Sequence, residues 1–342
     1  MKATIKRAVI TGGLETIAQA RLGRLAPSAA GRGIVFTLHH VRPHGPHAAG
    51  PGALLSITPD FLDAAIGTAV ARGYRPVALA EMTALIAGPD DGRRYAAFTL
   101  DDGLRDNIEH AAPVFRRRGV PYTLFVARGL VERTHTMWWE TVEALVLDAH
   151  GPLEFDFGDG AERLPLDTAR RRQRAFDRFA AFVERGEEEA AVAAIDAFAA
   201  GHGVNARAIV EREVADGDAL ASLRDDPLAR LGAHTVSHRN LARLAPDELA
   251  GEIEASVDAV RGWSAREVVS IAYPYGWSRA CGAREALAAR AAGLRIGVTT
   301  RPGVLRGAGE DDPMLLPRVS LNGLYQKPRY VEALMTGLPF LV

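Results

Sequence analysis

Two adjacent carboxylates and a pair of histidines are the residues of this 342-residue chain whose types and spacing suit a catalytic centre. Asp101 and Asp102 stand before Gly103, which permits a tight turn, so one carboxylate can bind a metal while its neighbour stays free as a base. His234 and His238 are spaced i, i+4, which places both imidazoles on one face of a helical turn and suits a divalent metal. Asp102 and the two histidines would make three ligands and leave an open position for water, as in catalytic zinc sites.

A metal site of this kind indicates hydrolysis. Water bound to such a metal has its pKa lowered from about 15.7 towards roughly 7, and a free carboxylate beside it can act as a base. Each motif alone also has an ordinary explanation, since Asp101-Asp102-Gly103 can be a solvated turn and an isolated histidine pair can lie at the surface or cap a helix. The combination favours the catalytic interpretation.

Short apolar runs of β type alternate with helical stretches along most of the chain. This alternation predicts parallel βαβ units, and therefore a barrel or a doubly wound sheet. The stretch 138–224 breaks the rhythm, and we interpret it as a mostly helical insertion between two strands. Its charge runs, 170–174 and 187–189, are interpreted as solvated helix faces. We expect strands at 34–38, 76–79, 96–100, 121–126, 228–232, 268–272 and 294–298, and helices at 58–71, 106–118, 246–263 and 283–292.

Polar clusters follow four of the expected strands at their carboxyl ends. In parallel barrels and open α/β sheets, catalytic groups gather at this edge. The sheet would therefore bring together residues that are far apart in the sequence. The four clusters, in chain order, are His39-His40, Asp101-Asp102-Gly103, His234-Thr-Val-Ser-His238 and Tyr273-Pro-Tyr-Gly276.

The composition and charge argue against several classes of protein and of binding partner. Lys and Arg total 41 against 42 Asp and Glu, and the net charge of −1 gives no reason to expect nucleic acid or an anionic membrane as a partner. A single cysteine, Cys281, excludes a disulfide framework and a thiolate metal cluster. No apolar run approaches the roughly 20 residues of a membrane span. The amphipathic stretch 1–24 makes a poor signal peptide, so we expect a cytoplasmic protein.

Three motifs together resemble those of the polysaccharide deacetylases, the NodB-homology or carbohydrate esterase family 4 enzymes. Phe98-Thr-Leu-Asp-Asp-Gly103 resembles their T-F-D-D-G motif, His234-Thr-Val-Ser-His238 matches their H-T-x-S-H motif, and Ala272-Tyr-Pro-Tyr-Gly276 resembles their R-x-P-Y motif. The resemblance covers roughly residues 34–322. It implies a distorted (β/α)7 barrel of the NodB type and metal-dependent removal of an acetyl group from an N-acetylated sugar.

The resemblance also assigns roles by position. Asp101 would be the general base, and the backbone N–H of Tyr275 would stabilise the tetrahedral oxyanion. The barrel would span 31–325 with the insertion 138–224, between an N-terminal amphipathic segment at 1–30 and a C-terminal tail or helix at 326–342. The expected partner is an N-acetylated carbohydrate. One divalent metal, with zinc expected, would be held by Asp102, His234 and His238.

The arginine that orients the base in this family falls at Ala272 here. We expect Arg318, which follows another apolar run, to reach Asp101 instead. An ordinary surface arginine is the alternative at this position.

The family's late acid histidine is also missing, because no histidine follows His238. The poly-N-acetylglucosamine deacetylases resemble this layout, with the acid on an early strand, which makes His39 the candidate acid. His40 is the alternative, since strand alternation puts the two side chains on opposite faces. His44 and His47 are expected to be loop residues.

Trp138 and Trp139 open the insertion and are candidates for binding sugar rings, with buried packing as the ordinary explanation.

The leading interpretation is a deacetylase that removes N-acetyl, or O-acetyl, groups from a glycan or its precursor. One alternative is a C–N hydrolase of a small cyclic amide or imide. Another is an inactive glycan-binding domain, against which Asp101 argues, because a binding domain needs no ionised base beside its metal.

Overall fold

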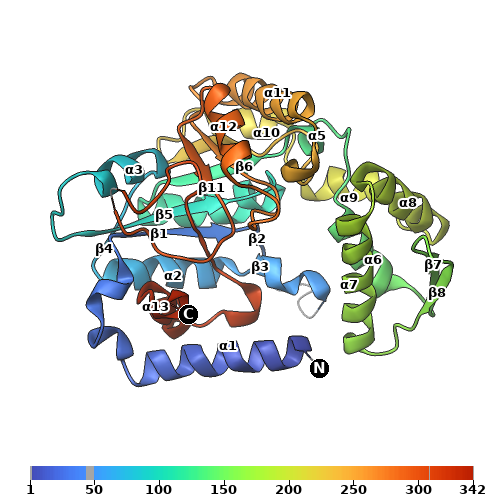
Figure 1. Ribbon diagram of the computed structural model, residues 1–342, viewed down its shortest axis with the longest axis horizontal. Coiled ribbons are helices and arrows are strands. Elements are labelled where there is room, and N and C mark those ends of the chain that lie inside the picture. Colours follow the sequence, from blue (N-terminus) through green and yellow to red (C-terminus); the bar gives the residue numbers. More distant parts are fainter. Residues whose placement is uncertain (1, 44–49, 308, 342) are drawn as a thin grey trace.

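The computed structural model describes residues 2–43, 50–307 and 309–341, so His44 and His47 lie outside the described part. Within that part, eight strands form one parallel sheet in the order β11-β10-β9-β6-β5-β1-β12, with β4 beside β5. The sheet curls into an incomplete barrel with helices around it (Figure 1), in agreement with the expected distorted β/α barrel. Its strands are β1 (Gly33–Leu38), β4 (Tyr74–Pro76), β5 (Arg94–Leu100), β6 (Tyr122–Val126), β9 (Ala229–Ala233), β10 (Ser270–Ala272), β11 (Ile296–Val298) and β12 (Val319–Ser320).

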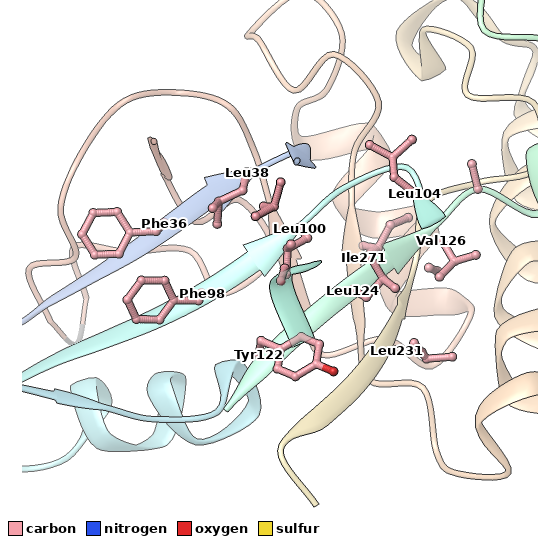
Figure 2. Packing of buried hydrophobic residues seen from close by; sticks show 14 of the residues in the cluster. Phe36, Leu38, Phe98, Leu100, Leu104, Tyr122, Leu124, Val126, Leu231 and Ile271 are labelled. Carbon is pink, nitrogen blue, oxygen red and sulfur yellow. The ribbon is translucent and has the colours of Figure 1, made fainter. Parts of the chain in front are cut away.

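The strand register aligns apolar side chains into rows on the outer face of the central strands. Phe36 of β1 lies opposite Phe98 of β5, which lies opposite Tyr122 of β6, and the two phenylalanine rings stack with their centres 5.1 Å apart. The rows pack against α2 (Pro59–Ala71), α4 (Ala112–Arg118) and α11 (Pro246–Ser264). A second row on the same face, visible in Figure 2, consists of Leu38, Leu100, Leu124 and Leu231. Because strand side chains alternate, the residues that lie between these two rows in the sequence face the inside of the barrel.

Residues 314–321, which we call the seam, include β12 and lie between β11 and β1, which the curled sheet brings near each other. Leu316 forms a parallel bridge to β11, and β12 pairs on its other side with β1. The Leu321 N–H donates to the Thr37 carbonyl at 3.0 Å. The seam thereby carries Arg318 to the inside of the barrel, beside the end of β5.

Most expected elements are present, with ends shifted by no more than two residues. The expected strand at 76–79 is wrong, because β4 ends at Pro76 and α3 (Leu79–Ala87) begins three residues later. Leu79, Met82 and Ile86 are buried at helical spacing, so the apolar run continues into a helix. A π-helical turn, Asn107–Ala111, precedes α4 in the helix expected at 106–118, and α12 spans Ala283–Ala291.

The first and last α-helices of the chain lie side by side (Figure 1). Helix α1 (Lys2–Gln19) packs on α13 (Pro328–Met335) through a cluster that includes Leu14 and Tyr330. Among the described residues, no helix combines the length and the apolar character needed to cross a membrane.

The insertion lies beside the barrel (Figure 1) and has its own hydrophobic cluster, in which Phe155, Phe157 and Phe179 pack together. A hairpin of β7 (Leu153–Asp156) and β8 (Ala161–Leu164) was not expected. The remainder is mostly helical, as expected. Its helices are α6 (Trp138–Asp148), α7 (Ala169–Arg185), α8 (Glu188–Gly201), α9 (Ala206–Glu213) and α10 (Gly217–Ala221).

Candidate metal centre and active site

Asp101 follows β5 on the inside of the barrel, where Arg318 of the seam binds its carboxylate through two contacts. Arg318 Nη1 donates to Asp101 Oδ1 at 2.7 Å and Nη2 donates to Oδ2 at 2.6 Å, while Nε donates to the Thr299 carbonyl at 2.8 Å. Burial raises the pKa of Asp101, but the charge and hydrogen bonds of Arg318 lower it more, so the carboxylate is held ionised. The contact expected between Arg318 and Asp101 is therefore present.

Asp102 would point to the opposite face if β5 continued, because successive strand side chains alternate. The backbone turns instead, with φ 76° at Asp102 and 74° at Gly103. This left-handed conformation suits glycine and is tolerated by aspartate. The turn lets the buried Asp102 carboxylate line the same cavity as Asp101.

The loop after β9 carries His234 and His238, and the helical turn expected there is wrong. The chain is irregular, with left-handed φ values of 64° at Thr235 and 57° at His238. This path still brings the imidazoles together, with their ring centres 4.9 Å apart. Glu252 of α11 holds the loop, because its Oε2 accepts hydrogen bonds from two successive backbone N–H groups at 2.8 and 2.9 Å.

Asp102, His234 and His238 direct their ligand atoms at one another, with all three atoms within 4.8 Å. Asp102 Oδ1 lies 3.3 Å from His234 Nε2 and 3.5 Å from His238 Nε2. The His234 Nδ1–H donates to the Ala272 carbonyl at 2.7 Å, which leaves the Nε2 lone pair for a metal. Burial lowers the pKa of His238 to about 4, so its imidazole is neutral, the form that binds metal.

The Asp102 carboxylate provides a further test of whether these three residues fit a metal ion. Its Oδ1 is buried and has no hydrogen-bond partner among the described residues. An unpaired buried carboxylate oxygen is costly, and a cation between the two imidazoles would satisfy it. Two nitrogens and one oxygen suit a zinc-type divalent ion. The donor set therefore fits the metal that the resemblance implies.

His39 and His40 face different surroundings, as strand alternation predicts. His39 lines the cavity, and its Nε2 lies 4.0 Å from Asp101 Oδ2, so the geometry favours His39 as the candidate acid. His40 is buried between Asp106, 2.6 Å from its Nδ1, and Glu140, 3.3 Å from its Nε2. Burial lowers the pKa of His40, but the two carboxylates raise it to about 10, so this imidazole is held as a cation.

Tyr275 follows β10 with a left-handed φ of 62°, a conformation that costs a residue other than glycine about 1–3 kcal/mol. No described residue accepts a hydrogen bond from its backbone N–H. Its hydroxyl donates to Glu188 Oε1 at 2.6 Å and accepts from Trp138 Nε1 at 3.1 Å. Burial and the Glu188 carboxylate raise the pKa of Tyr275 well above its ordinary value, so the hydroxyl keeps its proton.

These side chains line one cavity of about 310 Å³. Ligand sites commonly measure about 300–1,000 Å³, so this cavity suits a small ligand or the end of a larger one. Trp139 lies against His238, with ring centres 4.8 Å apart, while Trp138 is buried. The barrel supplies His39, Asp101, Asp102, His234, His238, Tyr275 and Trp277 to the walls, and the insertion supplies Trp138, Trp139, Ala180, Val183 and Glu188.

Three buried acids that brace the site, Glu140, Glu188 and Glu252, were not predicted. The interpretation of 187–189 as a solvated face is wrong for Glu188, which is only 7% exposed because it packs against Tyr275. Glu252 had a signal in the sequence, since its position falls within the buried face of an amphipathic helix. Glu188 had no such signal, because it stands in a run of three glutamates and nothing in the sequence distinguishes it from Glu187 and Glu189, which are exposed.

Comparison with known proteins gives one family match. Residues 178–296, which include the histidine loop and Tyr275, match the sequence model of the family described as polysaccharide deacetylase. The comparison with curated proteins gives no match. The family match confirms the resemblance drawn from the motifs.

Similar solved structures support the fold. Deacetylase PplD of Streptococcus pyogenes, in complex with acetate, is 16% identical with a TM-score of 0.55, over 85% of this chain and 92% of that chain. IcaB from Ammonifex degensii is 14% identical with a TM-score of 0.54, over 88% and 97%. A polysaccharide deacetylase from Bacillus cereus is 14% identical with a TM-score of 0.53, over 88% and 68%.

Proposed function

We propose that this chain is a polysaccharide deacetylase-like hydrolase of carbon–nitrogen bonds other than peptide bonds, which removes acetyl groups from an N-acetylated glycan or glycan precursor with one divalent metal. One observation carries the proposal. Three metal-ligand atoms lie within 4.8 Å of one another, and the ionised Asp101 lines the same cavity.

In this proposal, different residues of the chain have different roles in hydrolysis. The three ligands would hold zinc or a similar ion, which lowers the pKa of a bound water to about 7 and so provides the nucleophile. Asp101 accepts the proton of the attacking water, and Arg318 keeps this carboxylate ionised and oriented. The Tyr275 N–H donates to the amide oxygen as negative charge develops on it. His39 gives a proton to the leaving nitrogen, which is a very poor leaving group as an anion.

The walls of the cavity support a sugar as the substrate. Trp139 and Trp277 present aromatic rings to the cavity, and aromatic faces bind sugar rings well. The similar solved structures include a deacetylase in complex with acetate. Acetate is the product expected from this reaction.

The test combines metal analysis with substrate assays. Wild-type protein should hold one metal per chain and release acetate from chito-oligosaccharides, and it should hydrolyse p-nitrophenyl acetate. His238→Ala should lose both the metal and the activity, whereas His150→Ala, at an exposed histidine, should keep both. Full metal retention in His238→Ala would remove that residue from the ligand set. Turnover of a cyclic imide without acetate release, or glycan binding without any turnover, would overturn the proposed reaction.

A further inference from the structure

A buried carboxylate of the insertion, Glu188, contacts two catalytic loops at once. It lies at the start of α8 and is only 7% exposed, although Glu187 and Glu189 beside it are exposed. Glu188 Oε1 accepts from the Tyr275 hydroxyl at 2.6 Å, and Oε2 accepts from the Asn240 backbone N–H at 2.9 Å. Both oxygens are therefore used to hold protein groups.

The first of these loops needs external support. Tyr275 has a left-handed backbone, which a residue other than glycine keeps only where its surroundings hold it. Three hydrogen bonds hold it here: those with Glu188 and Trp138 at the hydroxyl, and one from Thr300 Oγ1, which donates to the Tyr275 carbonyl at 2.6 Å. Two of the three come from the insertion. These bonds restrain the residue at both its side chain and its backbone, so losing them would free the loop that sets the direction of the Tyr275 N–H.

The second loop carries a metal ligand. Asn240 lies two residues beyond His238, whose backbone is also left-handed. The bond from the Asn240 N–H fixes the outgoing end of this loop to α8, while Glu252 fixes its incoming end to α11. Glu188 thus spans the loop of the oxyanion donor and the loop of the metal ligand.

We propose that Glu188 is a positioning residue, which fixes the Tyr275 backbone N–H relative to the metal ligands and so makes the helical insertion part of the catalytic apparatus. The inference rests on the proposed function, because it assigns Glu188 to the oxyanion of that reaction. Glu188 itself does not touch the reacting atoms.

The kinetic test uses two variants and a matched control. Loss of one oxyanion donor costs about 10²–10³-fold in kcat, so misplacing it through Glu188→Ala should lower kcat about 10- to 100-fold, with KM and metal content unchanged. Tyr275→Phe removes only the hydroxyl and should lower kcat in the same way. The two effects on kcat should not multiply in the double variant, because both changes remove the same contact between Glu188 and Tyr275. Glu254→Ala, at an exposed acid of α11, should behave as wild type.

Amide hydrogen exchange on the metal-free protein gives a second measurement that does not depend on turnover. Glu188→Ala should speed exchange in both loops, 238–241 and 273–276, while Glu254→Ala should not. Unchanged kcat, metal loss that accounts for the slower rate, or effects that multiply in the double variant would overturn the inference. Wild-type protein with no metal-dependent hydrolysis would refute the proposed function instead, and the exchange experiment would still show whether Glu188 couples the loops. If Glu188→Ala does not fold, the same criteria apply to Tyr275→Phe.

Discussion

Replacing Arg318 with methionine should destabilise the folded protein, because it leaves the buried carboxylate of Asp101 without a counter-charge. The Arg318 side chain is fully buried and that of Asp101 is 3% exposed, and the guanidinium makes two contacts of 2.7 and 2.6 Å with the carboxylate. Methionine keeps much of the aliphatic length but removes the counter-charge and the donors to Asp101, Thr99 and Thr299. Removing one partner of a buried ion pair costs about 3–5 kcal/mol, because the other charge stays buried and unpaired.

Urea unfolding at neutral pH measures this free energy. We expect Arg318→Met to lower the free energy of unfolding by about 3–5 kcal/mol. Adding Asp101→Asn should recover part of the loss, because an amide needs no counter-charge. Arg295→Met removes a two-contact ion pair with Glu267 at the surface and should change stability little. A loss below about 1 kcal/mol in Arg318→Met, or no recovery in the double variant, would refute the reasoning.

Three further predictions concern the base, the acid and a buried cation. Asp101→Asn should keep the metal but lose about 10²–10⁴-fold in turnover, since it removes the base and leaves the ligands; near wild-type activity would place the base elsewhere. His39→Ala should reduce amide deacetylation far more than hydrolysis of an activated aryl ester, whose leaving group departs without a proton; equal losses with intact metal would exclude His39 as the acid. His40 has its pKa raised from 6.5 to about 10 on folding, so its stabilising effect is complete below pH 6.5 and is lost as the pH rises through about 10. The free energy of unfolding should therefore fall over this range in wild type, a fall that His40→Gln should lack, and parallel curves for the two proteins would contradict the assignment.

Strand periodicity was enough to predict where the chemistry lies. The apolar runs placed Asp101 and the histidine motif at the carboxyl ends of parallel strands, and the sheet does bring them to one cavity. Alternation also separated His39 from His40, because the period of a strand is fixed by its geometry. Such features depend on local backbone repeats, which leave a regular pattern in the sequence.

Features set by tertiary contacts were not predictable in this way. Thr235 is β-branched and does not favour the left-handed backbone that it adopts in the histidine loop, so the i, i+4 spacing alone predicts a helical turn there. Glu188 belongs to a charged run whose other members are exposed, and only the packing of α8 against Tyr275 buries it. Which group a buried acidic side chain contacts depends on the tertiary structure, so it cannot be predicted from the local sequence.

The seam has a consequence for how the protein acquires its activity. The contact between Asp101 and Arg318 joins residues separated by 217 positions, which is more than half the length of the 342-residue chain. Contacts of high sequence separation form slowly, because a large loop must close first. During synthesis the N-terminal part of the chain emerges first, so Asp101, which follows β5, is made long before Arg318, which precedes β12. We therefore expect a chain that ends before the seam to leave the Asp101 carboxylate without its counter-charge, so the seam is the segment that completes the proposed catalytic site.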